Sequence, residues 1–176
     1  MAQITSFTMD AERVVGIVLK SVLVVLFMST FSFMKDMIPI LNPFSWDETF
    51  QAIDRAMFFG HDGWELTFLI FGTPFATTII NAFYHAWLFV IYMFLLSAIF
   101  GLMRRDIQQT FLYAFMLTWS IGGVLLATLL SSAGPVYFAR LGFGGDFETQ
   151  MQLLRQFNEV SPVMALWVQD QLWATY

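Results

Sequence analysis

Few residues in this chain are suited to acid–base or metal chemistry, because it has two histidines and no cysteine. His61 lies in the run FFGHDGWE, where Asp62 and Glu65 are near enough in sequence to help it hold a metal ion or relay a proton. The alternative is a solvated turn with Asp62-Gly63 at its corner, and we favour this simpler interpretation. We therefore expect no metal site.

The second histidine, His85, lies in the apolar run NAFYHAWLF, with Asn81 one helical turn before it on the same face. A polar side chain at membrane depth usually faces the interior of a helix bundle and is a functional candidate by default. A hydrogen-bonded pair of Asn81 and His85 inside the membrane would instead satisfy the histidine locally, and we favour this second interpretation. A single histidine is weak evidence for a haem or a pigment, so we expect no cofactor.

The third candidate is Arg140, in the run SSAGPVYFARLG at residues 131–142. At the start of a loop outside the membrane, its guanidinium would reach a lipid phosphate through a charge-assisted contact. The alternative, which the sequence favours, is that Arg140 marks the membrane surface. The nearby glycines follow no strand and form no phosphate-binding loop, and no G-x-S-x-G motif occurs, so we assign no catalytic residue.

The elements that must position these residues are membrane helices. The 176 residues are 58% hydrophobic and 12% charged, with a mean hydropathy of +0.68, far from the composition of soluble domains. Residues 66–103 and 107–139 contain no charged side chain, and roughly 20 apolar residues cross a bilayer. We predict one all-α membrane domain over residues 1–176, with about three transmembrane helices. Their predicted bounds are 14–34, 76–103 and 107–132.

Amphipathic helices are predicted between and after the spans. One covers residues 45–59 and begins with a capping box formed by Ser45 and Glu48. Another covers residues 146–158. We expect its apolar side to carry Phe147, Met151 and Leu154, and its opposite side to carry Glu148, Gln152 and Arg155.

Proline and glycine mark further boundaries. Ser161-Pro162 begins a last helix over residues 162–175, and Pro74 separates residues 66–75 as a short piece of its own. Gly122-Gly123, in the middle of the third span, predicts the close approach of a neighbouring helix.

The short loop that contains Arg104-Arg105 predicts the orientation, because short basic loops stay on the cytoplasmic side. We therefore expect a plasma or inner membrane location, with the N-terminus in the cytoplasm and the residues after about 132 outside. The net charge of −5 argues against a nucleic-acid partner. Membrane lipids and other transmembrane helices are the expected partners.

The order of these motifs resembles a known family. The runs NPFSWDETFQAIDRAMFFGHDGWE, NAFYHAWLFVIYMF and SSAGPVYF, with a short basic loop before the last, are similar to the type 2 phosphatidic acid phosphatase superfamily. The closer similarity is to its branch of inositol phosphorylceramide synthases and inositolphosphotransferase-like proteins. It covers about residues 40–145. Its most specific parts are Asp54-Arg55 followed by Phe59-Gly60, and 133–135 followed by Tyr137.

The resemblance implies a six-span lipid phosphatase or phosphotransferase whose catalytic face lies outside the cytoplasm. In that family one histidine attacks phosphorus, a second protonates the leaving group and an aspartate orients the nucleophile, in P-S-x-x-H and H-x-x-x-D motifs. Neither motif occurs here, because Asp62 follows His61 directly and AFY precedes His85. The family's early Lys and Arg-Pro phosphate motif is also unmatched, and Gly134-Pro135 with Arg140 occupies the corresponding end of the third span.

Two functions follow as hypotheses. In the first, the chain resembles the N-terminal half of the six-span fold and is a truncated enzyme, inactive without the catalytic histidines. In the second, it is a non-catalytic accessory subunit packed against a larger respiratory or photosynthetic membrane complex.

Overall fold

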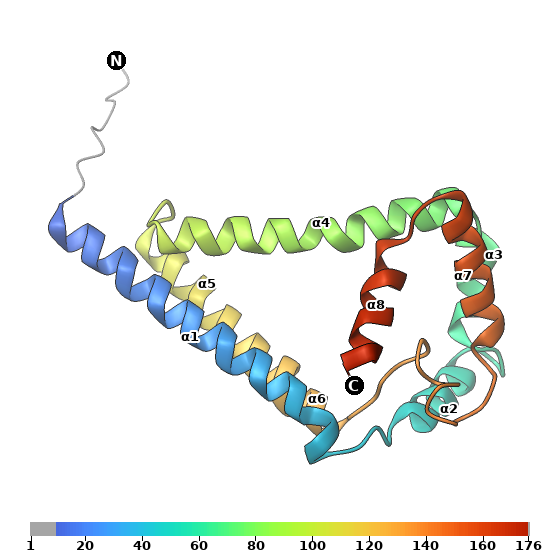
Figure 1. Cartoon of the computed structure of the whole chain (residues 1–176). Coiled ribbons are helices and arrows are strands. Elements are labelled where there is room, and N and C mark those ends of the chain that lie inside the picture. The colour runs from blue at the N-terminus through green and yellow to red at the C-terminus, as the bar shows by residue number, and fades with distance from the viewer. Residues whose placement is uncertain (1–9, 176) are drawn as a thin grey trace. The chain divides into compact units, whose positions relative to one another are not determined.

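The computed structural model describes residues 10–175, which form helices and no strand (Figure 1). The all-α prediction is confirmed for this part of the chain. In chain order the elements are α1 (Ala11–Leu41), α2 (Asp47–Met57), α3 (Gly63–Phe71), α4 (Pro74–Ile99), α5 (Arg105–Thr118), the π-helix η1 (Trp119–Leu126), α6 (Ala127–Leu129), α7 (Glu148–Val160) and α8 (Met164–Thr175).

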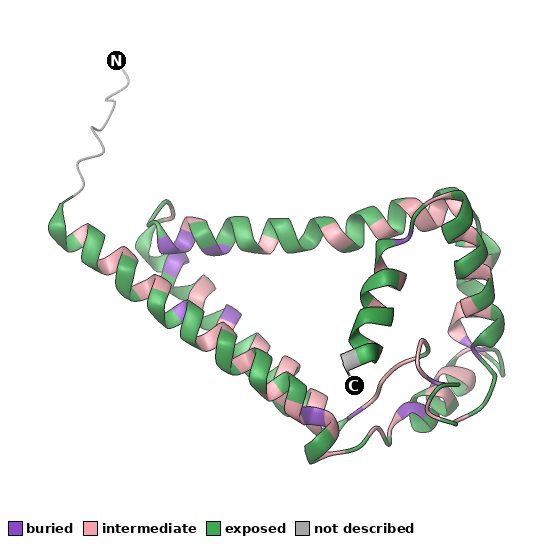
Figure 2. Ribbon diagram, viewed as in Figure 1, coloured by how far each residue is buried: buried purple, intermediate pink, exposed green. Residues whose placement is uncertain are grey.

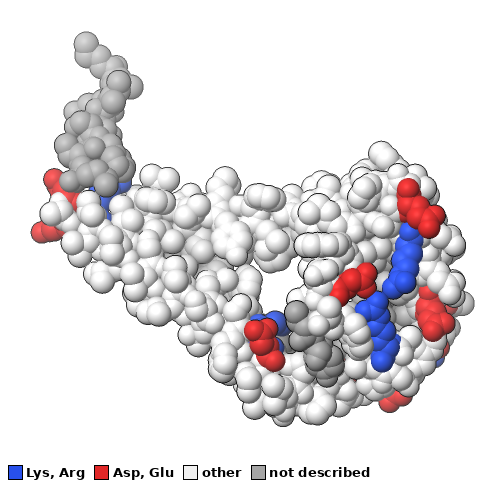
Figure 3. All heavy atoms as spheres, in the orientation of Figure 1, with Lys and Arg blue, Asp and Glu red and all other residues white. Residues whose placement is uncertain are grey.

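Three helical stretches are long and apolar enough to cross a membrane: Ala11–Leu41, Pro74–Ile99 and Arg105–Leu129. Each one contains most of a span predicted at 14–34, 76–103 or 107–132. The helix α4 contains no Asp, Glu, Lys or Arg, whereas charged side chains gather over α7 on the face drawn in Figure 3.

Local chemistry sets both ends of α4. Thr73 Oγ1 accepts the Ala76 N–H at 3.2 Å, and Pro74 follows at the first helical position, where a missing N–H costs nothing. At the other end, Gly101 adopts a positive φ of 68°. The bonds from Leu102 N to Ser97 O and from Gly101 N to Ala98 O complete a Schellman motif, so the helix ends before the predicted residue 103.

The short piece predicted before Pro74 is a separate helix, α3. It ends at Gly72, whose N–H bonds to Phe68 O at 2.9 Å. The separation of this piece from α4 is confirmed.

The described residues fall into two compact units. Unit 1 comprises the chain up to Met37 together with Ile91–Leu126, and unit 2 comprises Ile38–Val90 together with the chain from Ala127. The single domain over residues 1–176 stays a prediction. The predicted cytoplasmic N-terminus and Tyr176 lie outside the described residues.

A small apolar core holds unit 1 together. Val24 of α1, Leu95 and Ile99 of α4, and Phe115 of α5 are buried against one another. Figure 2 draws the buried segments of these helices in purple. Most other side chains of these helices are exposed, which suits helices whose remaining surface meets lipid tails or other helices.

The glycine pair of the third span lies in η1, and its two members differ. A Cβ on Gly123 would lie 2.7 Å from the ring of Phe31, whereas one on Gly122 would meet nothing within 4 Å. The same Phe31 ring packs edge-on against Trp119, with centroids 4.8 Å apart. The predicted close approach is therefore confirmed at Gly123, where an α1 side chain fills the space, and not at Gly122.

The face assignment of α7 is wrong in one respect. Glu148, Met151, Gln152 and Arg155 all line one pocket, so Met151 and Arg155 do not lie on opposite sides. Residues four apart share a helix face, and this spacing overrides the division into polar and apolar types.

Candidate functional site

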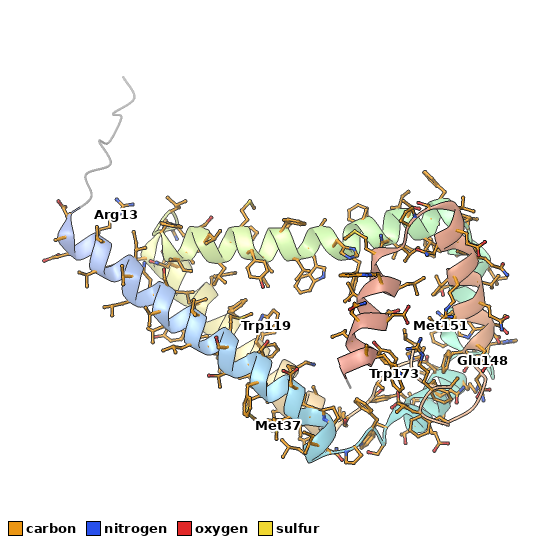
Figure 4. The ribbon with its side chains drawn as sticks, in the orientation of Figure 1. Arg13, Met37, Trp119, Glu148, Met151 and Trp173 are labelled. Carbon is orange, nitrogen blue, oxygen red and sulfur yellow. The ribbon has the colours of Figure 1, made fainter. Side chains whose placement is uncertain are left out.

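Arg140 lies in the segment between α6 and α7, and unit 2 surrounds it with defined partners. Its Nη2 donates to Asp170 Oδ1 of α8 at 2.8 Å, and its Cζ lies 5.4 Å from the centroid of the Trp173 ring. The Trp173 side chain on α8 is labelled in Figure 4. An ion pair and a cation–π contact thus hold the guanidinium in place.

Tyr137 forms the wall behind this guanidinium. Its ring stacks on Trp173 with centroids 5.2 Å apart, and its hydroxyl donates to Gln169 O at 2.8 Å. Burial raises the pKa of the Tyr137 phenol, while the charge of Arg140 lowers it and that of Asp170 raises it. The phenol is therefore a neutral hydrogen-bond donor at neutral pH.

A second arginine, which the sequence analysis did not select, shares this region. Arg155 of α7 and Arg140 both line two adjoining pockets of about 310 and 270 Å³, together with Val136 and Met151. Arg155 makes no hydrogen bond or ion pair within residues 10–175. Its place four residues after Met151 was the signal that could have assigned it to the same face.

Two amides complete the larger pocket. Asn158 Oδ1 accepts the Val163 N–H at 2.7 Å, and its NH₂ has no partner in the described part of the chain. Gln169 Oε1 is buried without a hydrogen-bond partner. The pocket therefore combines two guanidiniums and one carboxylate, that of Asp170, with amide groups that have unused hydrogen-bonding capacity.

The segment that leads to Arg140 is anchored by Asp47, which is 4% exposed. Its carboxylate accepts the Ser132 hydroxyl at 2.7 Å and the backbone N–H groups of Ala133 and Gly134 at 3.1 and 2.8 Å. In return, the N–H groups of Ser45 and Trp46 both donate to the carbonyl of buried Ser131, at 3.1 Å each.

The predicted capping box is wrong. The N-cap of α2 is Trp46, and it makes no side-chain capping bond. Asp47 occupies the first turn instead, where a carboxylate also interacts favourably with the helix dipole. Its partners lie 85 or more residues away, so no local pattern identifies them.

Arg55 ties the loop before α3 to the segment before α7. It donates to both carboxylate oxygens of Asp62, at 2.9 and 3.0 Å, and to Asp146 at 2.7 Å. These bonds raise the pKa of Arg55, with Asp62 contributing most, and the donation from Arg55 lowers the pKa of Asp146. The guanidinium therefore stays charged and bridges two carboxylates.

Because Asp62 pairs with Arg55, its carboxylate is not available for the metal site considered at His61. Asp62 is 4% exposed and faces Arg55, whereas His61 Nδ1 bonds to Glu65 at 2.8 Å on the exposed surface. Residues 10–175 contain no group of three side chains placed to hold a metal ion. The turn is solvated at His61, but Asp62 at its corner is buried.

Asn81 and His85 are hydrogen-bonded, but through the backbone. His85 Nδ1 donates to the Asn81 carbonyl at 2.7 Å. The Asn81 side chain instead accepts the Ala165 N–H at 3.4 Å, which connects α4 to the start of α8. Neither histidine lines the pockets of Arg140 and Arg155.

No protein-family model, no curated protein and no solved structure matches this chain.

Proposed function

We propose that this chain is an integral membrane protein that binds the phosphate of an anionic lipid headgroup between Arg140 and Arg155, without itself transferring the phosphoryl group. The proposal rests on one observation: two guanidiniums line the same pocket, and one of them has no anionic partner within residues 10–175. Guanidinium groups match phosphate oxygens in geometry and remain charged at any physiological pH.

The donors in the pocket exceed its internal acceptors. A guanidinium has five N–H donors, and the bond from Arg140 to Asp170 uses one of them. All five of Arg155 are free of partners within the described residues. A phosphate would fill this unused capacity.

This function fits the resemblance to lipid phosphatases and inositolphosphotransferase-like proteins, in a plasma or inner membrane with the residues after about 132 outside the cytoplasm. Phosphoryl transfer needs a positioned nucleophile and a proton donor. Neither histidine lines this pocket, so we expect substrate recognition without turnover. A phosphatase assay of the purified chain on short-chain phosphatidic acid should give no phosphate release.

Binding is tested by calorimetric titration of the purified chain, in an uncharged detergent, with short-chain phosphatidic acid. Phosphatidylcholine of the same chain length is the lipid control. We expect Arg155→Gln to weaken phosphatidic acid binding about tenfold, since about 1.4 kcal/mol corresponds to a factor of ten and charge-assisted hydrogen bonds reach this size. Lys35→Gln removes one positive charge that does not line the pocket and is the matched control.

Asp170→Asn gives the sharpest contrast. It removes the carboxylate that competes for Arg140, so the affinity for phosphatidic acid should rise several-fold. Equal binding of phosphatidylcholine, or an Arg155→Gln variant that binds like the unmodified chain, would contradict the proposal.

The accessory-subunit function is the second candidate, and exposed apolar side chains outside the three long helices favour it. Leu69 and Ile70 of α3 are 82% and 74% exposed, and Trp167 of α8 is 66% exposed. Such side chains suit a partner protein or lipid. Stoichiometric co-purification with a large membrane complex would support this function, and a solitary chain in mild detergent extracts would argue against it.

A further inference from the structure

Unit 1 contains a pocket of its own, of about 570 Å³, between the N-terminal parts of α1 and α5. The helix α1 contributes two cationic side chains, Arg13 and Lys20, and between them Gly16, which has no side chain. The side of α5 contributes Arg105, Gln108 and Gln109. Neither histidine and none of the residues around Arg140 takes part.

The spacing places these groups on two facing helix surfaces. Residues 13, 16 and 20 of α1 are spaced three and four positions apart. In α5, residues 105, 108, 109 and 112 are likewise three or four positions apart. Side chains at this spacing lie along one face, so Arg13 and Lys20 stand about 10 Å apart along the axis. Figure 4 labels Arg13 at the beginning of α1.

The pocket holds more positive than negative charge. Three cations line it, against the carboxylates of Asp10 and Glu12. The charges of Arg105 and Arg13 both act on the Lys20 ammonium, and neither Lys20 nor Arg105 forms a hydrogen bond or ion pair in the described part of the chain. The adjacent Arg104 differs, because it pairs with Asp106 at 2.7 Å and does not line the pocket.

The remaining lining provides room and an apolar wall. A Cβ on Gly16 would meet nothing within 4 Å, so this glycine faces open space. Gln108 donates its amide to the Ala98 carbonyl, which fixes it, whereas the Gln109 side chain has no partner within residues 10–175. The apolar part of the lining is formed by Ile17 of α1 and Leu112 of α5.

We propose that this pocket binds the phosphate group of an anionic phospholipid from the surrounding bilayer. Lys20 lies within a helix apolar enough to cross a membrane, and a cation at such a position is costly unless it reaches an anion or water. A phosphodiester at the headgroup level supplies that anion, with Arg105 and Arg13 as further donors and Ile17 and Leu112 facing the start of the acyl chains. Basic pockets between transmembrane helices bind anionic headgroups in this way.

The test is native mass spectrometry of the full chain, released from an uncharged detergent after incubation with phosphatidylglycerol or phosphatidylcholine. We expect Arg105→Gln to lose one bound phosphatidylglycerol, and Arg104→Gln, its neighbour of equal charge, to lose none. Gly16→Leu should lose the same lipid without any change of charge, because the added side chain fills the open space beside Lys20.

The variants also separate this pocket from the one in unit 2. Arg155→Gln serves as the background because it weakens binding in unit 2, and the lipid lost when Arg105→Gln or Gly16→Leu is added to this background then reports on unit 1. Retention of that lipid by both Arg105→Gln and Gly16→Leu would overturn the proposal. Its displacement by millimolar inorganic phosphate would overturn the assignment to a lipid, and resistance to phosphate would support it.

Discussion

Replacing Asp47 by alanine should release the segment 132–134 from the first turn of α2. The carboxylate accepts three hydrogen bonds, one from the Ser132 hydroxyl and two from the backbone N–H groups of Ala133 and Gly134. The Ser132 hydroxyl can rotate and donate to water instead, but the backbone N–H groups of Ala133 and Gly134 have fixed directions. The loss therefore depends mainly on these two donors.

The magnitude follows from their burial. An unpaired buried donor costs about 1–3 kcal/mol. Ala133 and Gly134 are half-buried, so water replaces part of each bond and the lower end applies, which gives about 2–3 kcal/mol for the pair. At about 1.4 kcal/mol per factor of ten, the amides of this segment should exchange about 30 to 150 times faster.

Hydrogen–deuterium exchange of the peptide that spans residues 130–140 measures this directly in detergent. Glu48→Ala is the matched control, because Glu48 is an exposed acid in the same helical turn and makes no bond to this segment. We expect it to leave the exchange of residues 132–134 within about threefold, as for most exposed substitutions.

The reasoning is refuted if Asp47→Ala exchanges like the unmodified chain. If Glu48→Ala and Ser45→Ala both accelerate exchange instead, the capping box is the correct description of the start of α2. Since the same segment leads to Arg140, Asp47→Ala should also weaken the binding of phosphatidic acid.

Two further predictions concern the contacts inside each unit. The pKa of Asp146 is lowered mainly because Arg55 donates to it, so this contact stabilises unit 2 above the unfolded pKa of about 4 and is lost as the pH falls through the lower folded value. The melting temperature should therefore fall more steeply below about pH 4 in the unmodified chain than in Asp146→Asn, and equal slopes would argue against the contact. In unit 1, Gly123→Ala places a methyl group 2.7 Å from the Phe31 ring and should destabilise by about 1–3 kcal/mol, whereas Gly122→Ala meets open space and should not. Thermal unfolding of the two variants compares them, and equal melting temperatures would contradict the packing of Phe31 on Gly123.

The helices were predictable from the sequence because their signals are local. Long uncharged runs and Pro74 are visible in the sequence itself, and the three apolar helices lie where the hydropathy places them. The bounds were less accurate, since the Schellman motif at Gly101 depends on backbone dihedrals that composition does not encode.

The site was predictable only at Arg140. Its position after an apolar run indicated a membrane surface, but its partners Asp170 and Trp173 lie 30 or more residues further along the chain. Residue type alone predicts Arg155 on the polar side of an amphipathic helix, whereas its four-residue spacing from Met151 puts the two on one face. The sequence predicts a cap from Ser45 and Glu48 and gives no acceptor role to Asp47, because three contacts across 85 to 87 residues carry no signature in a single sequence.

The two units differ in the contacts that stabilise each of them internally. This difference affects how each unit would respond to an anionic ligand. The buried cluster of unit 1 is apolar, with Val24 and Phe115 among its members. In unit 2, the contacts between distant segments include the buried carboxylate of Asp47, the pair of Arg55 with Asp146 and the pair of Arg140 with Asp170. An anionic ligand can replace Asp170 at Arg140 but has no such competitor at Arg155, so binding there should add to the internal contacts of unit 2 rather than exchange with them. Ligand binding stabilises a fold by RT ln(1 + [L]/Kd). Phosphatidic acid should therefore raise the melting temperature of the unmodified chain, and the rise should be smaller in Arg155→Gln.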